Sequence, residues 1–142
     1  MTKDRQVAVL IVGARPAGLT LAGDLARRKV SFRIIDKAPE CFAGSRGKGL
    51  QFRSLEVLDG LGVVDQILAN GRFHLPFRGY DGAIVLGDHD MHGGRVPTPD
   101  MPYASPLIIP QWRVEEILRN RLGEYGAWVE LATRTNRLCA KW

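Results

Sequence analysis

The first forty residues pass from an apolar run to a helical pattern and then to a second apolar run. Residues 5–12 are continuously apolar from Val7 onward, which predicts a buried strand. Residues 16–28 predict a helix, and residues 31–36 predict a second strand. Because a helix between two strands favours their parallel pairing, we expect a βαβ unit and an α/β fold. The apolar helix face consists of Leu19, Ala22, Leu25 and Ala26.

The rest of the chain divides into three segments by the same criteria. We expect residues 1–71 to hold the βαβ unit with further helices, 72–108 to be a β excursion rich in proline, and 109–142 to resume the α/β rhythm. A polar, glycine-rich loop covers residues 43–49. The further elements expected are helices at 52–61, 63–69 and 111–124, and strands at 73–80, 83–86 and 128–133.

The turn between the first strand and the first helix carries most of the chemical information. Gly13 permits a tight turn, Gly18 allows close packing of helix on sheet, and Pro16 suits a first helical turn. The free N–H groups at such a helix start bind a pyrophosphate. Asp36 follows Gly18 by 18 residues, close to the spacing of roughly 20 at which an acid reaches a ribose hydroxyl. The pattern therefore predicts a dinucleotide-binding unit.

Arg15 departs from the Gly-x-Gly-x-x-Gly fingerprint, because it stands where the middle glycine lets the backbone approach the pyrophosphate. Its side chain has two possible positions. It either swings outward and adds a cation near the phosphates, or it blocks their approach. We expect impaired binding.

Composition fits one ordinary domain and narrows the function class. The chain has 142 residues, is 45% hydrophobic and carries a net charge of +5. Its basic residues are dispersed among acidic ones, which argues against nucleic acid as a partner. No apolar stretch approaches the length of a membrane span, and the run Val7–Ala14 reads as a strand rather than a signal peptide. Cys41 and Cys139 are expected to be free thiols in the cytoplasm.

One cluster resembles a metal site. Asp88, His89, Asp90 and His92 are close in sequence, but they lie in a loop rich in glycine and proline with no helix to align them. We expect a solvated loop and no metal.

Three blocks together resemble the N-terminal third of the class A flavoprotein monooxygenases, the FAD-dependent aromatic hydroxylases of the para-hydroxybenzoate hydroxylase fold. The blocks lie in the family's order and cover essentially residues 5–133. They are Val12–Leu19 with Ile35–Lys37, Ser45–Leu58 with Leu61–Val63, and Ile109–Leu118.

The resemblance implies a role for each block. The turn would lie under the FAD pyrophosphate, Asp36 would take the adenosine ribose with Lys37 adjacent, Arg46 would reach the phosphates or ribityl chain, and Gln111 would hydrogen-bond the ribityl–phosphate region. From the residues alone, Arg46 could equally be a solvated loop charge and Gln111 a helix-start residue. Metal ligands are not expected, and catalytic residues are not identified. The turn residues are Gly13, Ala14, Pro16, Ala17 and Gly18.

The family's chemistry also implies partners. FAD would be reduced by NAD(P)H and would react with O2 to hydroxylate a phenol or polyketide-like aromatic substrate, with residues 72–108 entering the substrate layer. By the resemblance, the family's later Gly-Asp segment at the flavin ribityl and its Asp-Gly segment would lie beyond these 142 residues. We therefore expect a truncated, incomplete domain that is inactive alone, of marginal stability, and able to form homo-oligomers or aggregates.

Two further points qualify this expectation. Lys29 stands where the family has glycine, at a position that favours left-handed backbone. Two other functions stay open: another FAD- or NAD(P)-linked oxidoreductase, and a non-catalytic remnant or interaction module.

Overall fold

The computed structural model describes residues 6–73, 75–90 and 95–135. The chain forms two compact units. Unit 1 comprises Met1–Gly44 with Val114–Trp142, and unit 2 comprises Ser45–Arg113.

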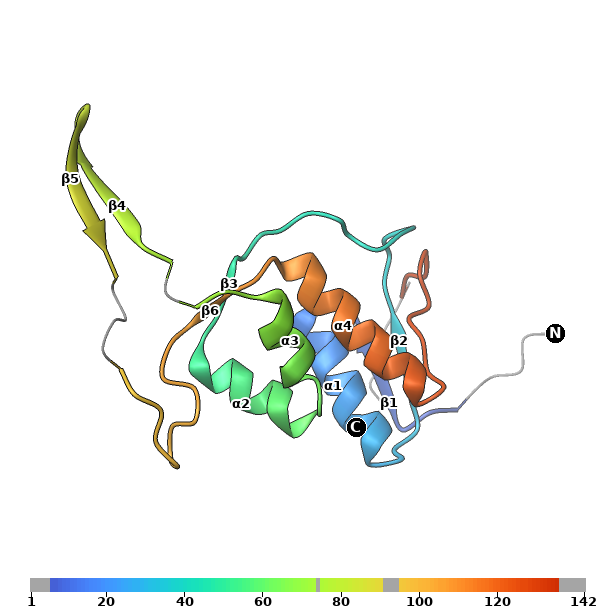
Figure 1. Cartoon of the computed structure of the whole chain (residues 1–142). Helices are drawn as coiled ribbons and strands as arrows, with labels where there is room; N and C mark the ends of the chain where they lie inside the picture. Colours follow the sequence, from blue (N-terminus) through green and yellow to red (C-terminus); the bar gives the residue numbers. More distant parts are fainter. Residues whose placement is uncertain (1–5, 74, 91–94, 136–142) are drawn as a thin grey trace, which may run out of the picture. The chain divides into compact units, whose positions relative to one another are not determined.

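Unit 1 contains the predicted βαβ unit (Figure 1). Strands β1 (Val9–Val12) and β2 (Phe32–Ile35) pair in parallel, and helix α1 (Pro16–Arg27) connects them. The α/β prediction is therefore confirmed here. Because parallel strands cannot be joined by a tight turn, the crossover helix both links them and covers one face of their sheet. The buried side chains of this layer are Ile11, Leu19, Ala22, Ile34 and Ile35.

The other face of β1 is open. Leu10 is 40% exposed and Val12 is 59% exposed. The prediction of a fully buried strand is therefore wrong for this face. The periodicity alone could not reveal this difference, because an apolar run does not say whether both sheet faces are covered.

Helix α1 ends as expected. Lys29 adopts φ 58°, and its N–H donates to Ala26 O at 3.0 Å while the N–H of Val30 donates to Leu25 O at 3.0 Å. This pair of bonds is a Schellman-type end, which normally has glycine at the left-handed position. The prediction of left-handed backbone at Lys29 is confirmed.

Helix α4 (Gln111–Glu124) has the predicted bounds, and Gly126 ends it with φ 71°. The following strand prediction, 128–133, is wrong in extent. Only Glu130 pairs with β2, through a parallel bridge to Ile35. The chain then turns at Ala132, which has φ 51°, and a left-handed residue cannot continue a strand.

Unit 2 contains two short helices and a short antiparallel pair of strands. Helices α2 (Phe52–Gly60) and α3 (Val64–Asn70) are joined through Gly62, which adopts φ 71°. Strand β3 (Gly49–Leu50) pairs antiparallel with β6 (Leu107–Ile108). Neither two-residue strand is evident in the sequence pattern. The fully buried apolar side chains here are Leu55, Val63, Ile67, Leu107 and Ile109.

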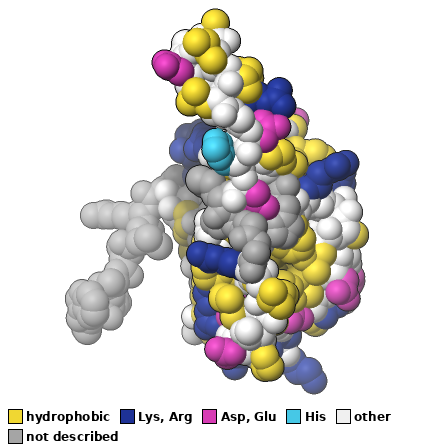
Figure 2. Space-filling view, turned by 60° about the vertical axis from the view of Figure 1, so that its left-hand side comes forward, with side chains coloured by type: hydrophobic (Ala, Val, Ile, Leu, Met, Phe, Trp, Pro, Cys, Tyr) yellow, Lys and Arg dark blue, Asp and Glu magenta, His cyan; other side chains and the backbone are white. Residues whose placement is uncertain are grey.

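The excursion after residue 72 contains the expected hairpin with shifted bounds. Strand β4 (Phe77–Asp81) starts later than predicted, and β5 (Ile84–His89) ends later. The register shifts between Gly79 and Tyr80. Apolar side chains gather at the tip of this ribbon in the space-filling view (Figure 2). The exposed apolar residues are Phe77, Tyr80, Ile84, Val85 and Leu86.

The helices have one further property in common. Across residues 6–73, 75–90 and 95–135, no helix has both the length and the apolar character that a membrane crossing requires.

Candidate functional site

The turn after β1 is built as the glycine spacing requires. Gly13 adopts φ +106°, and its N–H donates to Ile35 O at 2.8 Å, which joins the turn to β2. A Cβ on Gly18 would lie 2.0 Å from Gly13 O and 3.3 Å from a methyl carbon of Ile11. No side chain fits in that space, so helix and strand approach each other only because residue 18 is glycine.

The start of α1 leaves backbone donors available. Arg15 is the N-cap residue, with φ −89° and ψ 179°, and no side chain caps the helix. Among the described residues, no hydrogen bond engages the N–H groups of Ala17 and Gly18. The first turn also holds no acidic side chain. These donors and the positive end of the helix dipole favour an anionic group at this position.

Asp36 is fixed to the same turn. Its Oδ2 accepts a hydrogen bond from Ala14 N at 2.8 Å, and its Oδ1 accepts one from Ala38 N at 2.9 Å. The N–H of Ala14, then that of Ala38, holds the pKa of this carboxyl below its usual value, and the charges of Arg15 and Lys37 add to the effect. The carboxylate is therefore ionised and oriented next to the turn.

Arg15 points across this region instead of into open solvent. Its guanidinium Nη1 lies 3.5 Å from Glu115 Oε2, and its Cζ lies 4.4 Å from the ring centre of Phe42. Glu115 is almost completely buried, at 1% exposure. We did not foresee Glu115 or Phe42. A signal existed for Glu115, because it precedes Leu118 and Leu122 by three and seven positions on the apolar face of α4.

The two remaining predicted residues meet in unit 2. The side chain of Gln111 accepts a hydrogen bond from Arg46 N at 3.2 Å, and Ser45 Oγ accepts one from Gln111 N at 3.1 Å. The Arg46 loop is thereby tied to the start of α4. The predicted residues thus form two groups, one in each unit. Gly13, Ala14, Pro16, Ala17, Gly18, Asp36 and Lys37 lie in unit 1, and Arg46 and Gln111 lie in unit 2.

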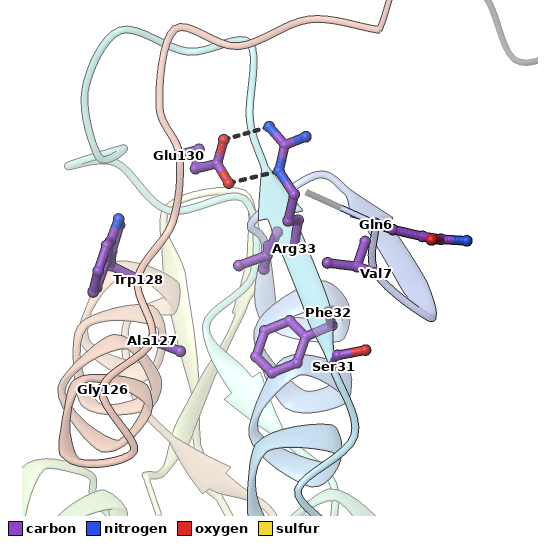
Figure 3. A pocket seen from close by; sticks show the side chains of 10 residues that line it. Gln6, Val7, Ser31, Phe32, Arg33, Gly126, Ala127, Trp128 and Glu130 are labelled. Atoms are coloured by element: carbon purple, nitrogen blue, oxygen red, sulfur yellow. Dashed lines mark hydrogen bonds and ion pairs between the residues drawn. The ribbon is translucent and has the colours of Figure 1, made fainter. Parts of the chain in front are cut away.

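A hollow of about 350 Å³ lies in unit 1, away from the glycine turn. In Figure 3 the side chains of Arg33 and Glu130 point toward each other across it, with two hydrogen bonds of 2.8 and 2.6 Å. It opens toward the amino ends of β1 and β2, where Val7 and Phe32 lie. Ligands of open α/β sheets bind at the carboxyl ends of the strands. The hollow is therefore not the predicted nucleotide site.

The expectation that this acidic and histidine cluster is a loop is wrong for Asp88 and His89, which belong to strand β5. Asp88 forms a two-pronged ion pair with Arg78 across the hairpin, with distances of 2.7 and 2.9 Å. His92 and Cys139 lie outside the described residues. Among the described residues, no group of three metal-binding side chains converges.

Comparison with known proteins extends these observations. A family model described as "FAD binding domain" matches residues 6–140. A flavin-dependent monooxygenase of Mycobacteroides abscessus is 45% identical over 128 residues, which are 87% of this chain and 27% of that protein. The 6-methylpretetramide 4-monooxygenase of Streptomyces rimosus is 40% identical over 122 residues, 86% of this chain and 21% of that protein.

Solved structures show the same fold. The flavin-dependent monooxygenase PieE, in complex with FAD and substrate, has a TM-score of 0.74 and 24% identity over 91% of this chain and 24% of its own. The rebeccamycin biosynthetic enzyme RebC has a TM-score of 0.75 and 23% identity over 95% of this chain and 27% of its own. The chain thus spans about a quarter of the length of these relatives. From residue 6 to residue 140, the chain belongs to the FAD-binding domain family whose curated relatives are flavin-dependent monooxygenases.

Proposed function

We propose that this chain binds FAD, with its diphosphate on the glycine turn and its adenosine ribose on Asp36. The observation that supports this most directly is the bond between Asp36 and Ala14 N at 2.8 Å. It fixes a ribose-binding carboxylate next to the free N–H groups of Ala17 and Gly18. A ligand that carries both an anionic group and a diol matches these two features, because the N–H groups would bind the anion and the carboxylate would accept from the diol.

The ionisation of Asp36 serves the proposed role. Because its pKa is lowered, the carboxylate is an acceptor throughout the neutral range. Each oxygen already accepts one backbone N–H and has capacity for a second donor. Two adjacent ribose hydroxyls are suitable donors. Lys37, exposed beside it, adds a positive charge at the same end.

The other two predicted residues, Arg46 and Gln111, lie in unit 2. We assign Arg46 to the phosphates or ribityl chain of FAD, because a guanidinium suits phosphate recognition. Gln111 accepts from Arg46 N and so holds that loop. We assign its amide N–H2 to the ribityl–phosphate region, because an amide N–H2 donates hydrogen bonds to hydroxyl and phosphate oxygens.

For the whole protein we propose hydroxylation of an aromatic, phenol or polyketide-like substrate with NAD(P)H and O2. The names of the relatives support this class, including 6-methylpretetramide 4-monooxygenase and pentachlorophenol 4-monooxygenase. Bound FAD would supply the electron transfer and oxygen activation. We propose that residues 72–108 form the segment that turns toward the substrate. The segments on either side of it, 1–71 and 109–142, would bind the nucleotide.

Titration of the purified chain with FAD tests the proposal. We expect quenching of flavin fluorescence on binding and weaker binding by Asp36→Asn, since an amide presents only one acceptor oxygen. Asp88→Asn is the matched control, because that carboxylate is paired on the hairpin. Binding of NADPH but not FAD would refute the assignment.

We also propose that the chain self-associates through the hairpin. Leu86 is 63% exposed and Ile84 is 67% exposed, and neighbouring apolar residues of this size favour association. Sedimentation velocity of the wild type and Leu86→Lys tests this. Equal sedimentation of both at all concentrations would contradict it.

A further inference from the structure

Arg15 occupies the third position of the glycine turn without distorting it. Its φ of −89° and ψ of 179° are extended backbone values that any residue adopts. Gly13 and Gly18 keep the turn and the close packing. What the arginine changes is therefore the space next to the turn, which its side chain fills.

Two contacts hold that side chain in place. The guanidinium lies 3.5 Å from Glu115 Oε2 and stacks 4.4 Å from the centre of the Phe42 ring. The Glu115 carboxylate is buried, and a buried carboxylate needs a nearby cation. Arg119 contributes a second cation at 3.8 Å from the same oxygen. Arg15 is 40% exposed, so it can leave this position, whereas Glu115 cannot.

The place that Arg15 fills is next to the proposed nucleotide site. One small hollow is lined by Ala14, Arg15, Asp36, Phe42 and Glu115 together with other residues of unit 1. Ala14 and Asp36 are the two residues joined by the hydrogen bond at the turn. The arginine side chain thus lies between the proposed ribose-binding carboxylate and helix α4.

We propose that Arg15 is a self-closing arm, which folds onto Glu115 and Phe42 and occupies the adenosine end of the site until FAD displaces it. The proposal rests on the assignment of FAD to this turn. The chain then has a closed state, with the arm on Glu115, and an open state, with the arm in solvent. Because only the open state binds, the apparent dissociation constant is raised by the inverse of the open fraction.

Variants of the arm and of its holding residues test this by fluorescence titration with FAD. Arg15→Gly removes the arm, and Arg15→Ala does so while keeping a Cβ at an unstrained position. We expect both to bind FAD more tightly than the wild type, by about tenfold for an open fraction of about one molecule in ten. Circular dichroism checks that each variant is folded.

Glu115→Gln and Phe42→Leu release the arm without changing the turn. We expect each to tighten binding by roughly threefold, since each removes one of two contacts. Arg28→Gln is the charge control: this arginine pairs with Asp24 at the opposite end of α1. Its affinity should equal that of the wild type.

The outcomes separate the arm from the proposed function. Weaker binding by Arg15→Gly and Arg15→Ala would identify Arg15 as a phosphate ligand. It would contradict the proposal that the Arg15 side chain closes the site. Tighter binding by these variants with unchanged Glu115→Gln and Phe42→Leu would also overturn it, because bulk at position 15 would then suffice. If the wild type and all variants bind no FAD, the proposed function fails together with the arm.

Discussion

The β1–α1–β2 unit and the β4–β5 hairpin both contain apolar strand residues, but these lie in opposite environments. In the first, α1 buries Leu19 and Ala22 completely against the sheet. In the second, Ile84 and Leu86 are more than 60% exposed. The difference follows from the connections. Parallel strands need a crossover, which here is the covering helix, whereas an antiparallel pair closes its hydrogen bonds through a tight turn alone. The apolar sequence predicts a strand in both cases, but it does not predict whether another element packs on that strand.

Truncation of matched leucines gives the largest expected contrast. Leu19→Ala should lower the free energy of unfolding by about 3 kcal/mol, because it leaves a cavity under α1. In dilute, unassociated protein, Leu86→Ala should change it by less than about 0.5 kcal/mol, because that side chain is exposed in the single chain. Urea unfolding measures both. Equal losses in dilute protein would mean that the hairpin is covered within the single chain, which would contradict the difference between the two regions.

Glycine substitution tests the close approach in the βαβ unit. Gly18→Ala should destabilise the chain by about 2–3 kcal/mol, because the new Cβ meets the backbone oxygen of Gly13. Gly123→Ala, near the end of α4, has no atom within 4 Å of the new Cβ. It should stabilise by about 0.5 kcal/mol through helix propensity. Thermal unfolding compares the two, and a neutral Gly18→Ala would refute the close approach of residue 18 to Gly13 and Ile11.

Substitution of one aspartate in each region compares how much a charged side chain contributes to stability there. The pKa of Asp36 is lowered by backbone N–H groups, and that of Asp88 is lowered by the exposed Arg78. Asp36→Asn should cost about 1 kcal/mol at pH 7, and Asp88→Asn should have no measurable effect, because exposed ion pairs contribute little.

The pH dependence has a definite sign. Since the folded pKa of Asp36 lies below the ordinary value of 3.8, its stabilising contribution is present above that pH. It is lost as the pH falls below 3.8 and through the folded pKa. Denaturation curves at several pH values should converge for wild type and Asp36→Asn in acid. A constant difference down to the lowest pH would contradict the assignment.

A last prediction concerns the end of α1. Lys29→Gly should stabilise the chain by about 1 kcal/mol, because φ 58° is strained for lysine and free for glycine. Arg28→Gly, at φ −88°, should destabilise it instead. A lower melting temperature for Lys29→Gly would show that the position is not left-handed in solution.

Local sequence features predicted their own elements well. Helix α4 begins at Gln111 and ends at Glu124 as the periodicity and Gly126 indicate, and the left-handed Lys29 follows the end of α1. The strand predicted at 128–133 failed for a non-local reason. Only Glu130 finds a partner on β2, and the chain turns away at Ala132.

The residues of the candidate site also fall into two groups, those that local sequence features predicted and those whose contacts only the structure shows. The positions of Gly13, Gly18 and Asp36 gave the turn and its acid, since each acts through the backbone next to it. The contacts of Arg15 with Phe42 and Glu115 join residues far apart in the chain, and no spacing rule relates them.

The sequence by itself determined the glycine turn, the helix it starts and the acid that follows, because backbone conformation and short-range hydrogen bonds depend on neighbouring residues. Only the tertiary structure decided which apolar strands are covered and where the Arg15 side chain lies. Burial and ion pairing depend on which distant segments meet, and that is set by packing over the whole fold.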